Sequence, residues 1–224
     1  INQNRSDSGG TVSGRLSYQN PNLQQLPARN PTLGPMIRSL FLPEEGQQWA
    51  AIDYSQQEPR ILVHYAKAYG DSKNTELAGL AEFVDGYTND PKMDFHTLVA
   101  EMAEIPRKQA KLINLAMMYG MGVNKLADQL NIDKAEAKVL TERYHDRVPF
   151  VRTLMQGVSR QLNDLRSSGS LRSLRGRKCR FDLWEPDSFE MHKALPREEA
   201  LAEYGATTRL VRAYTYKSLN RLIQ

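Results

Sequence analysis

Helical patterns that follow one another through the middle of the chain constrain its fold more than any other feature. Apolar residues recur at helical spacing over about 95–103 and again from 106 to about 120. A third helix is predicted after Asp133, which Glu136 follows three residues later, as in a capping box. Pro149 should end that helix, and another helical pattern begins directly after it. The middle of the chain is therefore predicted to be a set of packed helices.

The first part of the chain carries other patterns. Residues 1–35 are rich in Asn, Gln, Gly, Ser and Pro, which predicts loops and turns. A short, mostly apolar run at 48–52 predicts a buried strand that leads directly to Asp53. From Glu58 onward the spacing becomes helical, and Pro59 fits in a first turn, where its missing N–H is harmless.

The last part combines a turn-rich segment with one more helical pattern. A small hairpin is predicted over 171–181, and the charged, proline-containing residues 182–204 are interpreted as a surface insertion. A last helix is predicted over about 207–222. The fold class predicted for the whole chain is α+β, mainly helical, with a little sheet at its start and end.

Composition limits the class of protein only loosely. A chain of 224 residues with 40% hydrophobic residues can bury a real core, as one large domain or two small ones. Its net charge of +4 suits a nucleic-acid partner, although many other proteins are equally basic. Six cations and no acid lie between 166 and 180: Arg166, Arg172, Arg175, Arg177, Lys178 and Arg180. This cluster is either a solvated face or a set of phosphate contacts, and its composition leaves both open.

The cysteine content and the hydropathy indicate the setting. Cys179 is the only cysteine in the sequence, so no intrachain disulfide can form and a reducing compartment is expected. No uncharged apolar stretch approaches the ~20 residues of a membrane span, so no membrane partner is expected. The polar first residues lack the apolar centre of a signal peptide, and the absence of an initial Met suggests a piece of a longer protein.

The first motif with chemical content is Asp-Tyr-Ser-Gln-Gln-Glu-Pro-Arg at 53–60. An acid at the end of a rigid strand, followed by the backbone carbonyl of Tyr54, supplies hard oxygen ligands of the kind that magnesium prefers. Phosphoryl transfer uses such ions to bridge the oxygens of a triphosphate and to activate the attacking hydroxyl. Taken alone, an acid after a strand is more often a helix cap.

The second motif, Arg-Lys-Gln-Ala-Lys-Leu-Ile-Asn-Leu-Ala-Met-Met-Tyr-Gly, lies at 107–120. Arg107, Lys111, Leu115 and Tyr119 are each four residues apart, so they stay along one slowly rotating stripe of a helix, about 18 Å long. Such a stripe can hold a triphosphate at its cationic end and a base and sugar at the other. The spacing alone favours a plainer alternative, in which two solvated cations lie above a core-facing Leu and Tyr.

Together, and in this order, the two motifs resemble the metal-binding carboxylate motif and the nucleotide-binding helix of the Pol I-type (family A) DNA polymerases. The resemblance implies the fingers subdomain and part of the palm sheet of a right-hand polymerase fold, from a viral member of the family. It implies template-directed addition of deoxynucleotides to a primer 3′-hydroxyl, and therefore Mg²⁺, dNTP and primer–template DNA as ligands. The expected site of action is the cytoplasm, that of a bacterial host cell for a viral protein.

The resemblance also assigns roles to individual residues. Asp53 and Tyr54 would bind the metal, and Asp53 and Lys111 would be catalytic. The nucleotide would be bound by Tyr54, Gln56, Gln57, Glu58, His96, Arg107, Lys111, Leu115 and Tyr119. Within this set Glu58 is expected to exclude a ribose 2′-hydroxyl, and Arg107 and Lys111 to bind the triphosphate. Lys111 is also the candidate proton donor to pyrophosphate.

Further roles follow from the same resemblance. His96, in Asp-Phe-His-Thr at 94–97, would lie near the β-phosphate, and Tyr119 would stack on the templating side of the nascent pair. Three residues depart from the usual family pattern: Gln57 and Pro59, where aliphatic residues are usual, and Leu115 in place of an aromatic residue. Because Leu115 replaces an aromatic residue, the resemblance does not determine how the sugar of the nucleotide is packed and selected.

Three segments resemble the elements of this family that touch DNA. They are Ser-Gly-Arg-Leu at 13–16, Pro-Asn-Leu-Gln-Gln-Leu-Pro at 21–27 and Asn-Arg-Leu-Ile-Gln at 220–224. The DNA-binding residues expected on this ground are Arg15, Asn22, Gln24, Arg29, Asn220 and Gln224. Minor-groove acceptors are common to all base pairs, so such contacts can test the shape of a pair without distinguishing sequence.

The motif that carries the family's second metal-binding Asp, a His-Asp-Glu sequence in a hairpin, was not found. His-Asp-Arg at 145–147 lies too early, in a helical stretch, with Arg where an acid belongs. The chain is therefore expected to be a fragment or one subunit of a split polymerase. It should be inactive alone and should need the missing palm and thumb, in cis or as a second chain.

The resemblance divides the chain into three parts. Residues 1–60 would be the first part of the palm, 61–206 the fingers with an insertion at about 182–204, and 207–224 a helix returning toward the palm. Two other classes of function stay open. One is a non-catalytic nucleotide- or nucleic-acid-binding module derived from the fingers, and the other is a basic helical interaction domain with no nucleotide role.

Overall fold

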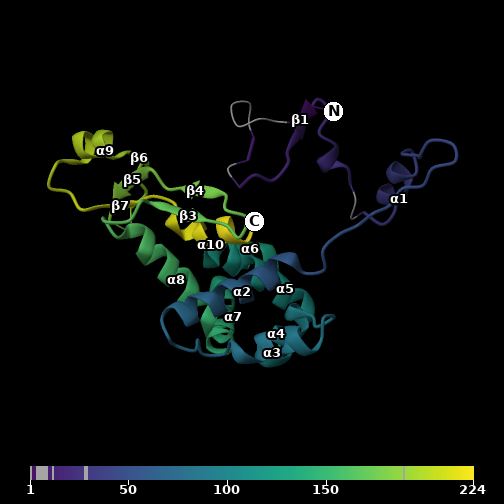
Figure 1. Ribbon diagram of the computed structural model, residues 1–224, viewed down its shortest axis with the longest axis horizontal. Helices are drawn as coiled ribbons and strands as arrows, with labels where there is room; N and C mark the ends of the chain where they lie inside the picture. Colours follow the sequence, from purple (N-terminus) through teal and green to yellow (C-terminus); the bar gives the residue numbers. More distant parts are fainter. Residues whose placement is uncertain (1, 4–9, 12, 28–29, 189) are drawn as a thin grey trace. The chain divides into compact units, whose positions relative to one another are not determined.

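The computed structural model describes residues 2–3, 10–11, 13–27, 30–188 and 190–224. It forms two compact units, Ile1–Ser55 and Gln56–Gln224. Helices dominate, and short strands lie near the start and the end of the chain (Figure 1). The predicted fold class, mainly helical α+β, is confirmed.

The first unit contains little regular structure. Strand β1 (Asn2–Gln3) pairs antiparallel with β2 (Tyr18–Gln19), and two short helices follow, η1 (Leu23–Gln25) and α1 (Leu33–Arg38). The buried strand predicted over 48–52 is wrong, because these residues have no regular structure and Ile52 is 95% exposed. A strand requires a neighbour for its backbone groups, and no described segment pairs with this one.

The second unit is built mainly from seven helices. They are α2 (Gln57–Ser72), α3 (Ala81–Asn89), α4 (Phe95–Ala103), α5 (Arg107–Met118), α6 (Val123–Leu130), α7 (Lys134–Arg147) and α8 (Pro149–Asn163). The helices predicted around α2, α4, α5, α7 and α8 are confirmed. Their ends follow local chemistry: Asp133 Oδ1 accepts the Glu136 N–H at 2.8 Å, and Pro149 occupies the first turn of α8.

The core of this unit forms where the helices bury their apolar faces. Phe83 packs against Phe95 and Phe150, with ring centroids 4.7 and 5.2 Å away, and all three side chains are fully buried. Burial of each large apolar side chain contributes about 1.5–3 kcal/mol. Ile113 of α5 and Leu62 of α2 belong to the same core, so both motif-bearing helices rest on it.

The hairpin predicted over 171–181 is confirmed: β3 (Ser170–Arg172) pairs with β4 (Lys178–Arg180). The segment 182–204, interpreted above as a surface insertion, carries β5 (Leu183–Pro186), β6 (Leu195–Pro196) and α9 (Arg197–Tyr204). It has a small core of its own, in which Trp184, Leu195 and Ala200 are buried.

The helix predicted over 207–222 is largely wrong. Its first half contains β7 (Leu210–Arg212), which pairs with β5 in a three-stranded sheet of order β6-β5-β7. Only η2 (Thr215–Lys217) and α10 (Ser218–Ile223) are helical. Pairing with β5 satisfies the backbone of these residues, and this tertiary contact outweighs the local helical spacing.

Arg212 joins this small sheet to α8 and the hairpin. Its guanidinium donates to the carbonyl oxygens of Leu162 at 2.9 Å, Phe181 at 3.0 Å and Ser167 at 3.3 Å. The same group lies 4.4 Å from the centre of the Trp184 ring. A planar group with five donors suits such a site, because it satisfies three carbonyls at once.

Candidate functional site

The predicted site is organised around the start of α4. Asp94 caps this helix: its Oδ1 accepts the backbone N–H of His96 at 2.8 Å and of Thr97 at 3.3 Å. Its Oδ2 accepts from Arg107 Nε at 2.9 Å and is also ion-paired with Arg107 Nη2. Thr97 Oγ1 accepts from the same Nε at 3.1 Å. One carboxylate therefore fixes both the first turn of α4 and the first side chain of α5.

These contacts determine the charge on Asp94. Burial acts to raise the pKa of this carboxyl, but the hydrogen bonds from Arg107 and from the His96 and Thr97 N–H groups outweigh it and hold the pKa below its usual range. Asp94 is therefore ionised at neutral pH. The side chain of Arg107 is 54% exposed, so the guanidinium stays accessible from solvent while it is paired.

His96 and Asn114 meet between α4 and α5. Asn114 is fully buried, His96 is only 7% exposed, and the Asn114 Nδ2 lies 2.9 Å from His96 Nδ1. Burial lowers the pKa of His96, and the positive charges of Lys111 and Arg107 lower it further, while Asp94 acts in the opposite direction. The imidazole is therefore neutral at pH 7.

The predicted stripe on α5 runs from exposed cations to partly buried apolar side chains. Arg107 and Lys111 are exposed, whereas Leu115 and Tyr119 are half-buried and pack against the core. This arrangement is compatible with both interpretations of the spacing, a nucleotide-binding stripe and solvated cations above a core-facing Leu and Tyr. The cations face solvent, and Leu115 and Tyr119 are held by the core.

Glu58, Tyr119 and Gln224 form a chain of hydrogen bonds. The Tyr119 hydroxyl donates to Glu58 Oε1 at 2.9 Å, and Gln224 Nε2 donates to the Tyr119 oxygen at 3.1 Å. Gly120 follows Tyr119 with φ of 65°, and a Cβ there would lie 2.7 Å from the carbonyl oxygen of Tyr216. Only glycine permits both this backbone conformation and this approach. The end of α5 is thus held closely against the last segment of the chain.

Gln56 ties the start of α2 to the segment before α4. It adopts a left-handed conformation, with φ of 53°. Its Nε2 donates to the Met93 carbonyl at 2.7 Å, and its Oε1 accepts from the Phe95 N–H at 2.8 Å and the Tyr87 hydroxyl at 3.3 Å. Its side-chain amide therefore bonds within the protein, while the adjacent Gln57 is exposed.

The predicted residues of the first unit that the structure describes lie outside its strands, and Asn22 and Gln24 are at the short helix η1. Asp53 and Tyr54 are exposed in a segment without regular structure. Asn22 Oδ1 accepts from the Gln24 N–H at 3.1 Å, and Gln24 Nε2 donates to the Leu16 carbonyl at 3.0 Å. Arg15 is exposed as well, and Arg29 lies outside the described residues.

The resemblance to polymerases assigns a metal to Asp53 and the Tyr54 carbonyl. Within the described ranges, no three or more His, Cys, Asp or Glu residues lie close enough together to hold a metal. Oxygen ligands of this kind suit magnesium, but a single carboxylate completes only part of such a site.

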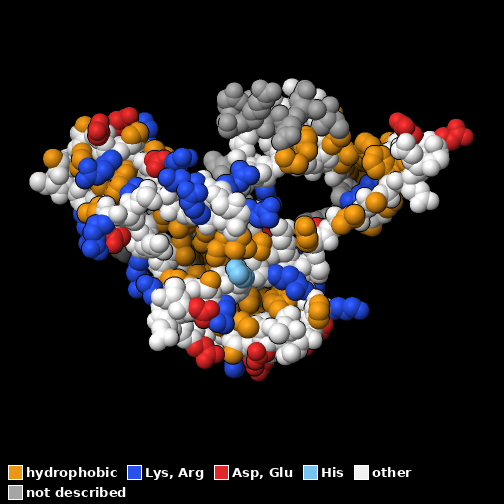
Figure 2. Space-filling model, viewed as in Figure 1, with side chains coloured by type: hydrophobic (Ala, Val, Ile, Leu, Met, Phe, Trp, Pro, Cys, Tyr) orange, Lys and Arg blue, Asp and Glu red, His pale blue; other side chains and the backbone are white. Residues whose placement is uncertain are grey.

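The six cations singled out in the sequence gather on and beside the β3–β4 hairpin (Figure 2). All six are exposed, and Leu171 and Cys179 point inward between them. Arg166 pairs with Asp164 at 3.2 Å. The alternation along the two strands explains the exposure, because successive side chains point to opposite faces.

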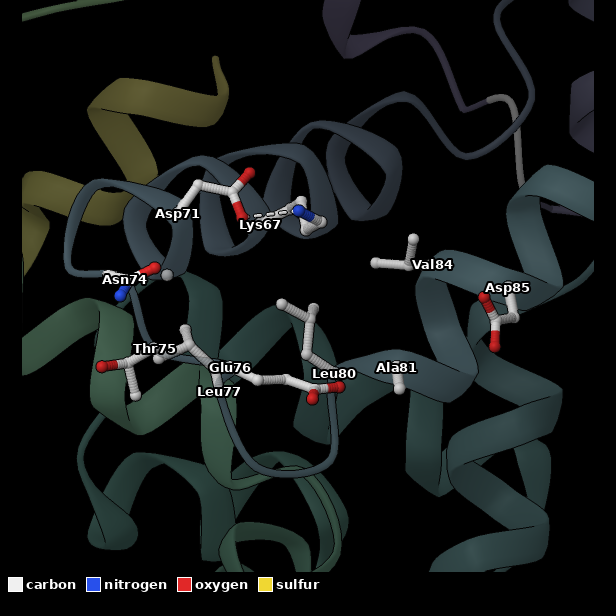
Figure 3. A pocket seen from close by; sticks show the side chains of 11 residues that line it. Lys67, Asp71, Asn74, Thr75, Glu76, Leu77, Leu80, Ala81, Val84 and Asp85 are labelled. Carbon is white, nitrogen blue, oxygen red and sulfur yellow. Dashed lines mark hydrogen bonds and ion pairs between the residues drawn. The ribbon is translucent and has the colours of Figure 1, made fainter.

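A cavity of about 590 Å³ lies elsewhere in the second unit, between the last turns of α2, the following loop and α3 (Figure 3). Its lining includes Lys67 and Asp71, which pair at 2.5 Å, together with Leu77, Leu80 and Val84. It shares no lining residue with the predicted site. In the part of the chain that the structure describes, no helix is long and apolar enough to cross a membrane.

Sequence reasoning gave no role to Asp94, Thr97 or Asn114. Asp94 stands immediately before an apolar helical run, which is the usual position of an N-cap and could have identified it. Asn114 lies in the buried stripe formed by Ala110, Ile113 and Met117. A polar residue within an apolar helix face is a signal for a buried hydrogen bond.

Known proteins are similar to this chain over most of its length. The family model described as DNA polymerase family A matches residues 4–207. A DNA-directed DNA polymerase of Pseudomonas phage M6 is 32% identical over 96% of this chain and 34% of its own length. The thermostable DNA polymerase I of Thermus aquaticus is 36% identical over 75% of this chain and 19% of its own length.

A solved structure matches as well. The polymerase domain of Pol1 from M. smegmatis, determined in complex with DNA primer-template and dNTP, superposes with a TM-score of 0.65 and 30% identity. The match covers 96% of this chain and 33% of that one. The chain thus spans about a third of the length of the phage relative and of this structure.

Proposed function

Because the chain belongs to the family A DNA polymerases, we propose that it supplies the fingers and the first part of the palm of a template-directed DNA polymerase. The complete enzyme would add deoxynucleotides to a primer 3′-hydroxyl, in the cytoplasm of a bacterial host. The observation that carries the proposal is the cluster at the start of α4 and α5. There an ion-paired Arg107, the nearby Lys111 and a neutral His96 provide donors for a triphosphate.

In the proposed enzyme, individual residues of this chain have distinct roles. Arg107 and Lys111 bind the triphosphate, and Lys111 supplies the proton to the departing pyrophosphate. Glu58, held by Tyr119, occupies the space of a ribose 2′-hydroxyl. Arg15, Asn22, Gln24, Arg29, Asn220 and Gln224 contact the primer–template. Asp53 and the Tyr54 carbonyl hold Mg²⁺, which when bound stabilises the charge that develops on the phosphate oxygens.

The test uses the complete polymerase, with the remaining palm and thumb present in cis or as a partner chain. Asp53→Ala should abolish primer extension. Lys111→Ala should lower kcat/KM for dNTP by at least ~10-fold, the low end of a general-acid contribution. Lys108→Ala, which removes an exposed cation from the same helix, is the matched control and should change kcat/KM by less than ~2-fold.

The outcomes separate the alternatives. Nucleotide or DNA binding that survives Asp53→Ala, with no extension by any version of the enzyme, would support the non-catalytic binding module. Equal effects of Lys111→Ala and Lys108→Ala would indicate that the cations of α5 are a solvated face.

A further inference from the structure

We propose that Asn114 is a positioning residue that holds His96 in one tautomer, with its proton on Nε2 and its Nδ1 free to accept. The tautomer is a property of the protein alone. The role of this tautomer, in which the Nε2–H donates a hydrogen bond to a phosphate oxygen of the incoming nucleotide, rests on the proposed function.

The first support is the position of the amide. Asn114 is fully buried on the face of α5 that packs against α4, among apolar neighbours. A buried amide is costly unless it is hydrogen-bonded. Its Oδ1 has no hydrogen-bond partner among the described residues, and its Nδ2 lies 2.9 Å from His96 Nδ1. The contact with His96 is therefore what stabilises an amide at this position.

The second support is the chemistry of that contact. The amide nitrogen only donates, so the imidazole nitrogen that faces it must be an acceptor. Nδ1 is then unprotonated, and the single proton of the neutral ring is on Nε2. An imidazolium would point an N–H at another N–H. No described residue hydrogen-bonds to Nε2, so this donor remains available to a ligand.

The surrounding charges act in the same direction. Arg107 and Lys111 on α5 disfavour a positive ring, and burial does so more strongly. Asp94 favours a positive ring, but its carboxylate already accepts from Arg107 and from two backbone N–H groups. Nothing in this set supplies the acceptor that an Nδ1–H would need. Asn114 decides which nitrogen carries the proton, and the charges keep the ring neutral.

The direct test observes the unsubstituted imidazole, and one variant is used only to assign its signal. Nitrogen-15 NMR of the chain labelled at its four histidines distinguishes the two neutral tautomers from the imidazolium. The His96 signal is identified by its loss in the His96→Gln variant. We expect a neutral Nε2–H ring at pH 7. Either an Nδ1–H tautomer or an imidazolium at that pH would overturn the proposal, as would a mixture of the two tautomers.

Two variants then test the role of the amide. Asn114→Asp places an acceptor opposite Nδ1, so the pKa of His96 should rise by at least ~1 unit and Nδ1 should become protonated. Asn114→Leu, nearly the same size, removes the donor and should leave a mixture of tautomers. An Nε2–H ring that persists in Asn114→Leu would show that something other than Asn114 sets the tautomer. Thermal melts identify any variant that fails to fold, in which case the wild-type spectrum decides.

The use of the proton is tested in the complete polymerase. Asn114→Leu should raise KM for dNTP by at least ~5-fold, but by less than ~2-fold when His96→Gln is already present, because coupled residues are not additive. Equal effects in both backgrounds would assign Asn114 a purely structural role. Failure of the proposed polymerase function would show as an absence of extension by the unsubstituted enzyme, and it would leave the NMR result unchanged.

Discussion

The carboxylate of Glu58 is hydrogen-bonded by a tyrosine. The carboxylate accepts the Tyr119 hydroxyl at 2.9 Å, so its side chain is oriented by the end of α5. A rejected sugar would meet a fixed obstacle rather than a mobile side chain. Discrimination of this kind depends on a clash with the wrong ligand rather than on attraction to the right one.

We therefore expect Glu58→Ala, in the complete polymerase, to raise the ratio of ribonucleotide to deoxynucleotide incorporation by at least ~10-fold, or ~1.4 kcal/mol. Tyr119→Phe leaves the carboxylate but removes one hydrogen-bond donor to it, so the ratio should rise by a smaller factor. Competitive incorporation at a single template position measures both. A ratio unaltered in Glu58→Ala would show that residues 53–60 do not correspond to the family motif as assigned.

At the scale of elements, the first turns of α4 and α5 are joined by one ion pair, between Asp94 and Arg107. Asp94→Asn retains a capping oxygen but loses the charge, and the free energy of unfolding at pH 7 should fall by about 1 kcal/mol. Folding lowers the pKa of Asp94, so the ionised carboxylate adds to the free energy of unfolding. This stabilisation is complete above the unfolded pKa of about 3.9 and is lost as the pH falls through the lower folded pKa.

Urea unfolding at several pH values checks this expectation. The difference between wild type and Asp94→Asn should be constant from pH 7 to 5 and should shrink below about pH 4. Asp85→Asn, which changes an exposed carboxylate on α3, is the control. A difference that grows in acid would mean that Arg107 does not stabilise the charged carboxylate in solution.

Arg212 gives a second prediction at this scale. Arg212→Lys cannot satisfy three carbonyl oxygens in one plane, so it should lower the free energy of unfolding by ~1–3 kcal/mol. Arg209→Lys is the matched control, because Arg209 lies on the same segment but is 85% exposed and pairs only with Asp187 among the described residues. Thermal and urea unfolding of the two variants measure the comparison. Equal losses would mean that the three carbonyls do not depend on the guanidinium.

Elements with local signals were predictable from the sequence, and those that depend on distant partners were not. The capped helix α7 follows from nearby residues, Asp133 and Pro149, and the β3–β4 hairpin follows from its turn-rich segment. β7 forms because β5 lies beside it, which helical spacing cannot reveal. The stripe on α5 was likewise visible in the sequence. The pairing of Asn114 with His96, and the contacts of Gln56, required the packed helices.

At the scale of the molecule, the proposed function gives this chain one metal-binding carboxylate, Asp53, of a site that requires two. We expect the purified 224-residue chain alone not to extend a primer, because two-metal chemistry needs more ligands than Asp53, and no cluster of three or more His, Cys, Asp or Glu that could hold a metal lies among the described residues. Adding the remaining palm and thumb, in cis or as a second chain, should give extension. Gel-resolved extension of a labelled primer is the measurement. Robust extension by the isolated chain would contradict the expectation.

The hydrogen bonds of Tyr119 also have a consequence for the order of folding. Glu58 lies 61 residues before it in sequence, and Gln224 lies 105 residues after it. Helices form early because their contacts are local in sequence. Contacts between residues so far apart in sequence must first overcome the entropy of closing a long loop. On the ribosome, α2 to α8 could pack while Gln224 is still unsynthesised. The tyrosine that orients Glu58 would acquire its hydrogen bond from Gln224 only when the last residue of this sequence emerges.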